Sequence, residues 1–370
     1  MIYRPYGLSE ISVSVIGFGG MRFKDQKDVQ GCAELVQTAY ARGINYFDTA
    51  PGYGDSELLF GVAFKEMLKT RQEKPFYVST KTTASEPAAI RRELEQSLTR
   101  MGLDQVDFYH MWNIMSVEKY NRRKAKGALA EFEKLQQEGL IKHICISAHV
   151  SGHEMETILA DYPFAGILLG YSAMNFRYRE AALAAAARDR RAVVVMNPLG
   201  GGLIPQHPQR FGFIRKDETE SVVEGALRFL INDPRITVAL VGFSSVAEVD
   251  EAVASAEGFA PMPASRYEAI KTGIQKEFAE LCTGCQYCDH CPEGIPVPRL
   301  MDAYNHYLLS GKEIDLLNRL FWHWTIAKED EVLRACTTCR QCEDLCTQHL
   351  DICDRLATIR EIADRAIRRA

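Results

Sequence analysis

The sequence predicts an α/β fold in which an eight-stranded parallel β/α barrel precedes a small all-α domain. Short apolar runs alternate with amphipathic stretches through the first 260 residues. A segment rich in proline and alanine, Ala260–Ser265, then interrupts the pattern and is typical of a linker. Nine of the eleven cysteines lie beyond residue 280, among stretches of helical periodicity. We therefore expect the barrel over residues 1–260 and a helical cysteine domain over residues 266–370.

Eight apolar runs, each bounded by turn-forming residues, are the predicted strands of the barrel. They are Val13–Gly17, Ile44–Phe47, Phe76–Thr80, Val106–Trp112, His143–Ser147, Ala165–Gly170, Ala192–Met196 and Thr237–Val241. A doubly wound open sheet is the alternative arrangement of such β-α units. It is disfavoured because no G-x-G-x-x-G motif opens a helix after the first strand, where Gly17-Phe18-Gly19-Gly20 is too short for that motif.

Amphipathic stretches between these strands are the predicted helices. They include Val29–Arg42, Ala88–Met101, Ala125–Glu138, Glu180–Arg190 and Ser221–Ile231. The cysteine domain has further helical stretches, which are Tyr267–Leu281, Val297–Leu309, Ile314–Ala327 and Asp354–Arg369. The β-α unit is the only internal repeat that we find in the sequence.

The composition is that of a globular protein and excludes several functions. Hydrophobic residues make up 46% of the chain and charged residues 25%, which are ordinary values. A formal net charge of −5 without a basic stripe argues against nucleic-acid binding. No apolar run approaches the ~18 residues that a membrane span needs, and the N-terminal stretch MIYRPYGLSE lacks the apolar core of a signal peptide. We expect a cytoplasmic protein that binds a small-molecule substrate and neither nucleic acid nor a membrane.

The stretch Ile44–Glu57 indicates a catalytic rim. Its predicted strand stops at Asp48, and a turn rich in glycine and proline then presents Tyr53. Lys81 ends the next predicted strand. A single aspartate at such a place is more often a loop anchor. An acid, a phenol and an amine close to neighbouring strand ends indicate catalysis instead, because active sites of parallel barrels lie at this end.

This stretch, INYFDTAPGYGDSE, resembles the signature of the aldo/keto reductases, and the similarity continues through roughly the first 258 residues. In that family an Asp, a Tyr, a Lys and a His lie at the C-terminal mouth of the barrel. Asp48, Tyr53 and Lys81 match the first three. The resemblance implies that Tyr53 is the general acid of carbonyl reduction, that the Lys81 ammonium favours its anion, and that Asp48 holds the lysine charged and aimed.

The fourth position of the family departs from its pattern here. Counting from Asp107, the usual histidine position falls on Trp112, and His110 comes two residues earlier. Residues two apart on a strand face the same side, so we expect both to point toward the pocket. His110 would lie one layer deeper, where a core histidine with satisfied hydrogen bonds is the commoner role. Trp112 would donate its indole N–H or shape the pocket.

The resemblance also implies a nicotinamide nucleotide, NAD(H) or NADP(H), bound by loops that follow the barrel strands. The matching positions are Gly20, Met21, Ser147, His149, Pro198, Leu199, Gly201, Gly242, Ser244 and Ser245. The helix N-terminus after Gly242 suits a phosphate. Plain helix capping explains Ser244 or Ser245 about equally well.

Other positions depart from the nucleotide-binding pattern. Leu168 stands where the family usually has a glutamine, and Glu248 stands where many members have an arginine for the adenosine end. No lysine or arginine occurs between residues 236 and 259, so a 2′-phosphate lacks a local partner. Arg215 or Lys216, on the preceding loop, would have to extend to the 2′-phosphate to pair with it.

Two groups of cysteines have the spacing of iron–sulfur ligands. They are Cys282-x2-Cys285-x2-Cys288-x2-Cys291 and Cys336-x2-Cys339-x2-Cys342-x3-Cys346. In a chain without an export signal, such groups favour metal binding over disulfides. Structural zinc is the alternative. Zinc sites rarely use a third and a fourth cysteine at the same short spacing, so the pattern favours iron–sulfur clusters.

This spacing is similar to that of two-cluster bacterial ferredoxins, in which the fourth cysteine of each run serves the other cluster. The resemblance implies two [4Fe–4S] clusters, one held by Cys282, Cys285, Cys288 and Cys346 and the other by Cys336, Cys339, Cys342 and Cys291. The two-residue gap before Cys291 and Thr347 after Cys346 depart from the ferredoxin pattern. Cys353 is left over, and we expect a small buried apolar residue there rather than a ligand.

A barrel reductase with a ferredoxin-like tail resembles the iron–sulfur branch of the aldo/keto reductases. This implies an oxidoreductase that reduces a small carbonyl or related compound, with a nicotinamide nucleotide or with electrons relayed through the clusters. Ferredoxin or another redox protein would be its partner. The alternative is an electron-transfer protein whose barrel has lost nicotinamide-dependent reductase activity and serves as a binding scaffold. The intact Asp48, Tyr53 and Lys81 argue against that alternative.

Overall fold

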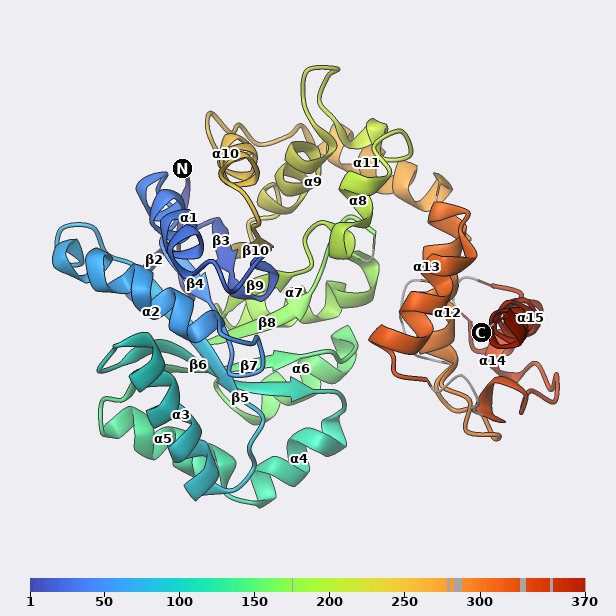
Figure 1. The fold of residues 1–370 in the computed structure, drawn as a ribbon, viewed down its shortest axis with the longest axis horizontal. Helices are drawn as coiled ribbons and strands as arrows, with labels where there is room; N and C mark the ends of the chain where they lie inside the picture. Colours follow the sequence, from blue (N-terminus) through green and yellow to red (C-terminus); the bar gives the residue numbers. More distant parts are fainter. Residues whose placement is uncertain (175, 278–279, 283–287, 327–330, 347–348, 370) are drawn as a thin grey trace. The chain divides into compact units, whose positions relative to one another are not determined.

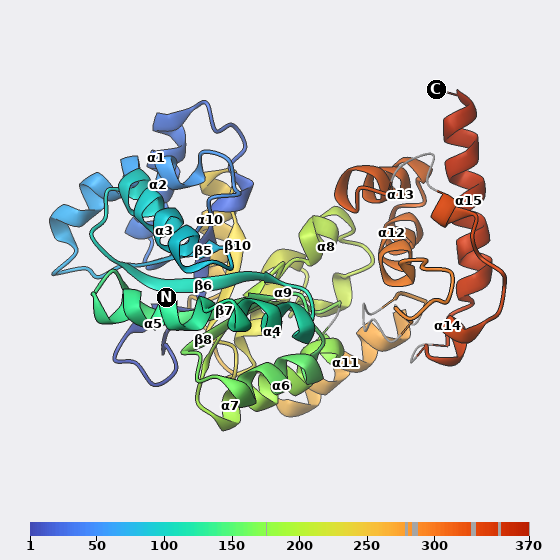
Figure 2. The same ribbon diagram turned by 90° about the horizontal axis from the view of Figure 1, so that it is seen from below.

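A computed structural model describes the chain except for residues 175, 278–279, 283–287, 327–330, 347–348 and 370. The chain forms two compact units, Met1–Pro205 with Phe211–Tyr267 and Gln206–Arg210 with Glu268–Ala370. Figures 1 and 2 show barrel strands surrounded by helices in the first unit, and helices without a sheet in the described part of the second. None of the described helices is both long and apolar enough to span a membrane.

Eight parallel strands close into a barrel in the order β10-β3-β4-β5-β6-β7-β8-β9. Their bounds are β3 Ile16–Gly19, β4 Tyr46–Asp48, β5 Tyr77–Thr82, β6 Val106–Ile114, β7 Ile141–Ala148, β8 Gly166–Gly170, β9 Ala192–Met196 and β10 Val238–Gly242. The predicted parallel barrel is confirmed. An antiparallel hairpin of β1 (Tyr3–Pro5) and β2 (Ser12–Ser14) precedes it, so Val13 belongs to the hairpin and not, as predicted, to the first barrel strand.

Helices follow the strands and cover the outside of the barrel (Figure 1). They are α1 Val29–Ala41, α2 Ser56–Met67, α3 Pro87–Met101, α4 Val117–Ala125, α5 Ala128–Gln137, α6 Gly152–Asp161, α7 Glu180–Arg188, α8 Leu203–Gln206, α9 Val222–Ile231 and α10 Val246–Ala254. The predicted helix Ala125–Glu138 corresponds to α5, which begins three residues later, and α4 before it was not predicted. Gly127 separates α4 from α5 because its φ of 88° is incompatible with a continuous helix.

Side chains alternate between the barrel interior and the surrounding helices, as the pleat of a strand requires. On β4, Tyr46 and Asp48 point inward, whereas Phe47 packs against Phe60 and Phe64 of α2 with ring centroids 6.0 and 5.8 Å apart. This alternation delivers an acidic side chain to the interior directly after an aromatic one on the outside. The short apolar run of the sequence is therefore a strand buried on both faces.

Aromatic side chains fill the interior next to the N-terminal hairpin. The Tyr6 ring stacks on Phe108 with centroids 3.9 Å apart, and Phe108 also stacks on Tyr46 at 5.4 Å. Tyr6 Oη lies 3.4 Å from the thiol of Cys145, which is fully buried. Because this layer is a packed core, chemistry is confined to the other end of the barrel, where the strands end.

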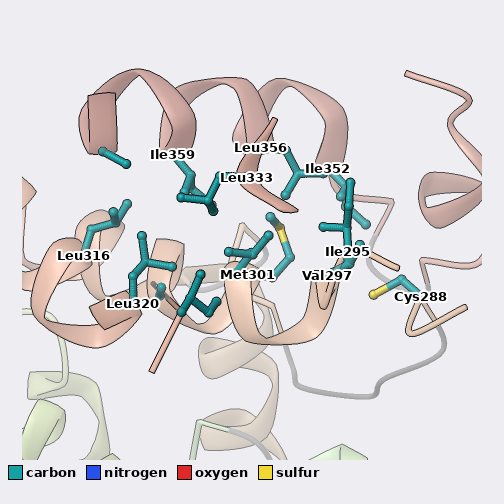
Figure 3. Close-up of a cluster of buried hydrophobic side chains, with 14 of the residues drawn as sticks. Cys288, Ile295, Val297, Met301, Leu316, Leu320, Leu333, Ile352, Leu356 and Ile359 are labelled. Atoms are coloured by element: carbon teal, nitrogen blue, oxygen red, sulfur yellow. The ribbon is translucent and has the colours of Figure 1, made fainter. Parts of the chain in front are cut away.

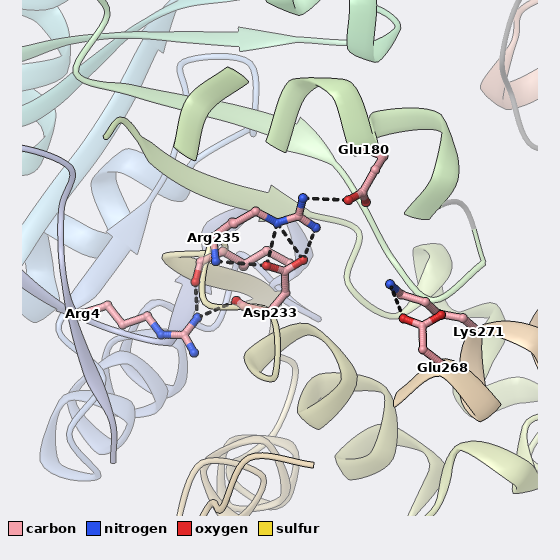
Figure 4. A network of polar contacts seen from close by, with 7 residues as sticks. Arg4, Glu180, Asp233, Arg235, Glu268 and Lys271 are labelled. Atoms are coloured by element: carbon pink, nitrogen blue, oxygen red, sulfur yellow. Dashed lines mark hydrogen bonds and ion pairs between the residues drawn. The ribbon is translucent and has the colours of Figure 1, made fainter. Parts of the chain in front are cut away.

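An arginine network fastens the N-terminal hairpin to the barrel (Figure 4). Arg4 donates hydrogen bonds to the backbone carbonyls of Asp233, at 3.0 Å, and of Ile236. Arg235 forms ion pairs at 2.6 Å with both Asp233 and Glu180. The hairpin, the turn before β10 and helix α7 are thus held together.

The described part of the second unit is helical, as predicted. Its helices are α11 Ala264–Glu277, which begins in the first unit, α12 Val297–Ser310, α13 Glu313–Asn318, α14 Gln341–Asp344 and α15 Ile352–Arg369. The predicted helix Ile314–Ala327 is shorter in the structure, because α13 passes into a single π-helical turn over Arg319–His323. The second unit has its own hydrophobic core (Figure 3). Helix α15 contributes Ile352, Leu356 and Ile359 to it, which lie on one face of the helix.

Candidate active site and metal centre

Two buried ionisable side chains lie at the carboxyl ends of neighbouring strands. Asp48 ends β4 and Lys81 is the penultimate residue of β5, with exposed fractions of 1% and 0%. Lys81 Nζ donates to Asp48 Oδ1 at 2.5 Å and to the carbonyl of Thr49 at 2.7 Å. Ser79 Oγ donates to the other carboxylate oxygen of Asp48 at 2.7 Å. Each charge is therefore paired and hydrogen-bonded, as buried charges require.

The electrostatics keep the lysine protonated. Burial by itself would lower the pKa of Lys81, but Asp48 and then Tyr53 outweigh it and raise this pKa above its ordinary value. Burial raises the pKa of Asp48, and the Lys81 ammonium opposes that shift. Lys81 consequently places a fixed positive charge at the barrel mouth.

Tyr53 reaches the same ammonium from the loop after β4. Lys81 Nζ lies 4.9 Å from the centroid of its ring. Gln26 holds this loop, since its side-chain amide donates to the Tyr53 carbonyl at 3.0 Å and accepts from the Asp55 N–H at 2.8 Å. Burial raises the pKa of Tyr53, although Lys81 acts to lower it. The ammonium thus acts in the predicted direction, but burial outweighs it and leaves the phenol protonated.

His110 lies beside Lys81, as its register partner on β6. It is fully buried, and neither ring nitrogen has a hydrogen-bond partner among the described residues. Burial, and then the charge of Lys81, lower the pKa of His110 to about 3, so its ring is neutral near pH 7. The residue is a buried core histidine, as expected.

Trp112 packs against the predicted acid. Its ring meets that of Tyr53 edge to face, with centroids 5.6 Å apart and an interplanar angle of 84°. Arg123, buried on α4, donates to the Trp112 carbonyl at 2.6 Å and to the Thr82 carbonyl at 3.0 Å. It therefore fixes the ends of β5 and β6, which carry Lys81 and Trp112. The sequence did not reveal this positioning role, because Arg123 lies within an ordinary charged helix.

The mouth of the barrel also holds a buried hydroxyl available for a ligand. Ser147 is 1% exposed at the end of β7, and its Oγ has no partner among the described side chains and backbone groups. Its register partner on β8 is Leu168, which is apolar and equally buried. Gly170, at the end of β8, faces open space, since an added Cβ would meet no atom within 4 Å.

The other predicted nucleotide-binding residues lie in loops after strands β3, β7, β9 and β10. Gly20 and Met21 form a turn after β3, His149 follows β7, Pro198, Leu199 and Gly201 follow β9, and Gly242 ends β10 before Ser244 and Ser245. In the loop after β9, Gly200, Gly201 and Gly202 have φ values of 63°, 71° and 98°. Only glycine adopts such a run of positive φ readily. The N–H groups of Gly200 and Gly202 donate to the carbonyls of Asn197 and Leu199 at 2.9 and 3.1 Å, which closes the loop into a tight turn.

A carboxylate already occupies the N-terminus of α10. Glu248 accepts hydrogen bonds from the Ser244 N–H at 2.7 Å and from Ser244 Oγ at 2.9 Å. Ser245 caps the helix by accepting from the Glu248 N–H at 3.3 Å. Ser245 is thus the capping residue of α10, and a role of either serine in nucleotide binding stays a prediction. Arg22, which the sequence did not single out, packs on Gly242 and brings a cation to this corner, because a Cβ on Gly242 would lie 2.6 Å from Arg22 Cγ.

Two of the cysteines predicted for the first cluster lie in the core of the second unit. Cys288 and Cys346 are 6% and 8% exposed within one hydrophobic cluster (Figure 3 shows Cys288). Asn305 clamps the backbone of Cys282, accepting from its N–H and donating to its carbonyl, both at 2.8 Å. Cys285 lies outside the described residues.

The cysteines predicted for the second cluster line one cavity. Its lining includes Cys291, Cys336, Cys339 and Cys342, the four residues predicted for the second cluster, together with Cys353. Among the described residues, no three Cys, His, Asp or Glu side chains converge as closely as a single metal ion requires. The four thiols on one cavity provide the all-sulfur donor set that a [4Fe–4S] cluster requires.

Comparison with known proteins decides the family. The model of the aldo/keto reductase family matches residues 15–273. The chain belongs to the aldo/keto reductase family. A second model, of a 4Fe-4S dicluster domain, matches residues 281–350 and so favours iron–sulfur clusters over zinc in the tail of this aldo/keto reductase.

Relatives of this aldo/keto reductase include several oxidoreductases. The NADH-specific methylglyoxal reductase of Escherichia coli is 30% identical over 225 residues, which cover 54% of this chain and 68% of that protein. L-galactose dehydrogenase of Arabidopsis thaliana is 26% identical over 288 residues, which cover 68% and 87% of the two chains. An aldo-keto reductase structure from Bacillus halodurans, in its holo form, has a TM-score of 0.63 at 24% identity, covers 75% of this chain and 96% of its own, and shows the shared fold.

The predicted resemblance is therefore confirmed for both parts of the chain. It is an oxidoreductase of the aldo/keto reductase type with an iron–sulfur domain after its barrel. The structure brings Asp48, Tyr53, Lys81, His110 and Trp112 together at one end of that barrel.

Proposed function

We propose that this aldo/keto reductase reduces a small carbonyl compound to an alcohol, with Tyr53 as the proton donor. The observation that carries the proposal is the buried Asp48–Lys81 pair with the Tyr53 ring against its ammonium. A nicotinamide nucleotide, when bound, supplies the hydride that attacks the carbonyl carbon. Tyr53 Oη gives its proton to the carbonyl oxygen, and the nearby ammonium of Lys81 stabilises the phenolate that remains.

The neighbouring residues support this assignment of the acid. Because the pKa of His110 is about 3, its ring is the neutral imidazole at neutral pH and lacks the acidic proton of an imidazolium. We propose that Asp48 keeps Lys81 charged and aimed, and that Trp112 restrains the Tyr53 ring in the place where other family members have a histidine.

For the nucleotide, the barrel mouth fits a nicotinamide, and the corner at α10 favours NADH over NADPH. The unpartnered Ser147 hydroxyl suits the carboxamide, and Arg22 suits the pyrophosphate. Glu248 stands where many members have an arginine, and its carboxylate takes both donors of Ser244. A 2′-phosphate there would meet negative charge in place of a cation. The Escherichia coli relative, which is NADH-specific, agrees with this preference.

For the tail, we propose two [4Fe–4S] clusters that exchange electrons with a redox protein such as ferredoxin. Cys282, Cys285, Cys288 and Cys346 would hold the first, and Cys291, Cys336, Cys339 and Cys342 the second. The common cavity of the last four supports the second set. A hydride carries two electrons whereas each cluster accepts one, so a direct hydride-to-cluster step is not part of the proposal.

One experiment tests the reductase, and a second tests the coupling to the clusters. Tyr53→Phe should abolish NADH-dependent reduction of methylglyoxal, used here as the first probe, and leave the visible iron–sulfur spectrum unchanged. Full activity in this variant would assign the proton to another group. Anaerobic titration with NADH, with and without a carbonyl substrate, then shows whether the clusters bleach. Bleaching without any carbonyl reduction would favour the alternative function, an electron-transfer protein with a non-reducing barrel.

A further inference from the structure

Five thiols line the cavity at the predicted second cluster, although a [4Fe–4S] cluster needs four ligands. The fifth belongs to Cys353, the second residue of α15. It is 5% exposed and close enough to Cys342 for the two side chains to interact, with Cys336 as another neighbour. The expectation of a buried residue is met, but its surroundings are those of a ligand site.

Contacts on two sides hold Cys353 in this position. Its backbone N–H donates to Glu343 Oε1 at 2.8 Å, and Arg340 donates to the other carboxylate oxygen of Glu343 at 3.0 Å. On the other side, Ile352 and Leu356 anchor the first turn of α15 in the hydrophobic core, with exposed fractions of 1% and 6%. The thiol therefore sits on a rigid helix beside the segment that carries Cys342.

The fourth ligand that the ferredoxin pattern implies, Cys291, is less closely tied to this group. Cys336, Cys339, Cys342 and Cys353 come from one segment of eighteen residues, whereas Cys291 precedes that segment by 45 residues. Cys291 also follows a two-residue gap where ferredoxins have three. The cavity thus offers two candidates for one coordination position.

We propose that Cys353 is a ligand-competent thiol of the second site, able to hold a [4Fe–4S] cluster with Cys336, Cys339 and Cys342 when Cys291 is absent or released. This inference rests on the proposed second cluster. In the exchange, the bond between iron and the Cys291 sulfur breaks, and Cys291 takes up the proton that Cys353 gives up as its own iron–sulfur bond forms. No electron is transferred. The cluster would then be attached to α15 and no longer to the first cysteine group.

The test is the iron and sulfide content of full-length protein purified without oxygen. Wild-type protein should contain about eight of each per chain, the content of two [4Fe–4S] clusters. C291A should retain about eight, and C291A/C353A should fall to about four. Failure of the wild type to reach eight would remove the proposed second cluster itself, which is a different result from a loss confined to the variants.

C346A is the matched control, because Cys346 is the corresponding fourth ligand of the first site and Cys353 lines only the other cavity among those described. It should fall to about four iron atoms. A second variant, C291A/C353S, offers an oxygen ligand in the same place and should shift the electron paramagnetic resonance spectrum of the reduced second cluster relative to C291A. Three results would each overturn the proposal. They are loss of half the iron in C291A alone, retention of all eight iron atoms in C291A/C353A, and identical spectra for C291A and C291A/C353S.

Discussion

Lys81 Nζ donates to Asp48 Oδ1 at 2.5 Å, at a point where neither side chain reaches solvent. The two residues lie near the carboxyl ends of adjacent parallel strands, so the barrel itself sets their separation. Removing one partner of such a pair leaves an uncompensated charge in the interior. The pair therefore matters to the stability of the barrel as well as to its chemistry.

We predict that Asp48→Asn lowers the free energy of unfolding by about 3–5 kcal/mol, because Lys81 is left buried without its counter-charge. Lys81→Met should cost a similar amount. The double variant should be more stable than the sum of the two losses implies, since it leaves no unpaired charge. Urea unfolding of the four proteins, followed by circular dichroism, measures this coupling. Additive losses would show that the pair contributes nothing as a pair.

The low pKa of His110 should make the free energy of unfolding depend on pH. Its pKa in the folded chain is about 3, whereas an unfolded histidine titrates near ~6.5. Between these values the unfolded chain binds a proton that the folded chain does not, so the free energy of unfolding falls as the pH falls. The contribution of this group is about 1.4 kcal/mol for each pH unit well inside that window.

His110→Gln should therefore flatten the decline of stability between pH 6 and about pH 4, which urea unfolding at several pH values measures. His153→Gln is the matched control, because the His153 side chain is 74% exposed and should leave the slope unchanged. An equal slope in His110→Gln and wild-type protein would show that His110 titrates normally in the folded state.

The barrel and the positions of its key residues were predictable because they follow from local patterns. Apolar runs of strand length ending in Asp48 and Lys81 place both side chains at one mouth once the strands are parallel. The start of α5 was predicted three residues too early, because a glycine inside a helical pattern, here Gly127, is often tolerated.

Contacts between distant segments were not predictable. Arg22 lies on Gly242 and Cys353 lies beside Cys342 only because the chain folds back on itself. The role of Glu248 was predictable only in part. The sequence showed an acid in place of an arginine, but not that this carboxylate accepts hydrogen bonds from both the N–H and the hydroxyl of Ser244. Likewise, the pattern suggested that Lys81 would lower the pKa of Tyr53, but the depth of burial that reverses the net shift depends on the packed barrel.

Glu248→Ala should improve the use of NADPH. Removing the Glu248 carboxylate frees the N–H and hydroxyl of Ser244 and deletes a negative charge. At short range, the repulsion between that charge and a 2′-phosphate is worth about 1 kcal/mol. KM for NADPH should therefore fall roughly five-fold, while KM for NADH changes little. Steady-state kinetics with both nucleotides measures this. Glu251→Gln, one charge removed from the same helix, is the control. Equal shifts in the two variants would point to a general charge effect and away from a specific site.

Trp112→Leu should lower kcat/KM, because the Tyr53 ring loses the contact that restrains it. The edge-to-face contact is worth about 0.5–1.5 kcal/mol beyond buried area, so kcat/KM should fall roughly two- to ten-fold, and Trp112→Phe should lose less. Trp322→Leu serves as the control, since this tryptophan is 83% exposed in the second unit. If Trp112→Leu kept full activity, Trp112 would be only a wall of the pocket.

Asn305 gives a test of the first cluster that leaves every cysteine in place. Its side chain clamps both backbone groups of Cys282 at 2.8 Å from a position that is 8% exposed. Asn305→Ala leaves the Cys282 N–H and carbonyl without these partners, at a cost of about 1–3 kcal/mol, and frees the first ligand of the cluster to move. A chelator should therefore remove iron from this variant several-fold faster than from wild-type protein. Only half of the iron should be lost at this faster rate, and the visible absorbance of the clusters measures the loss. Asn318→Ala, on the exposed face of α13, should match the wild type. Equal rates in all three proteins would mean that the clamp on Cys282 does not control access to the cluster.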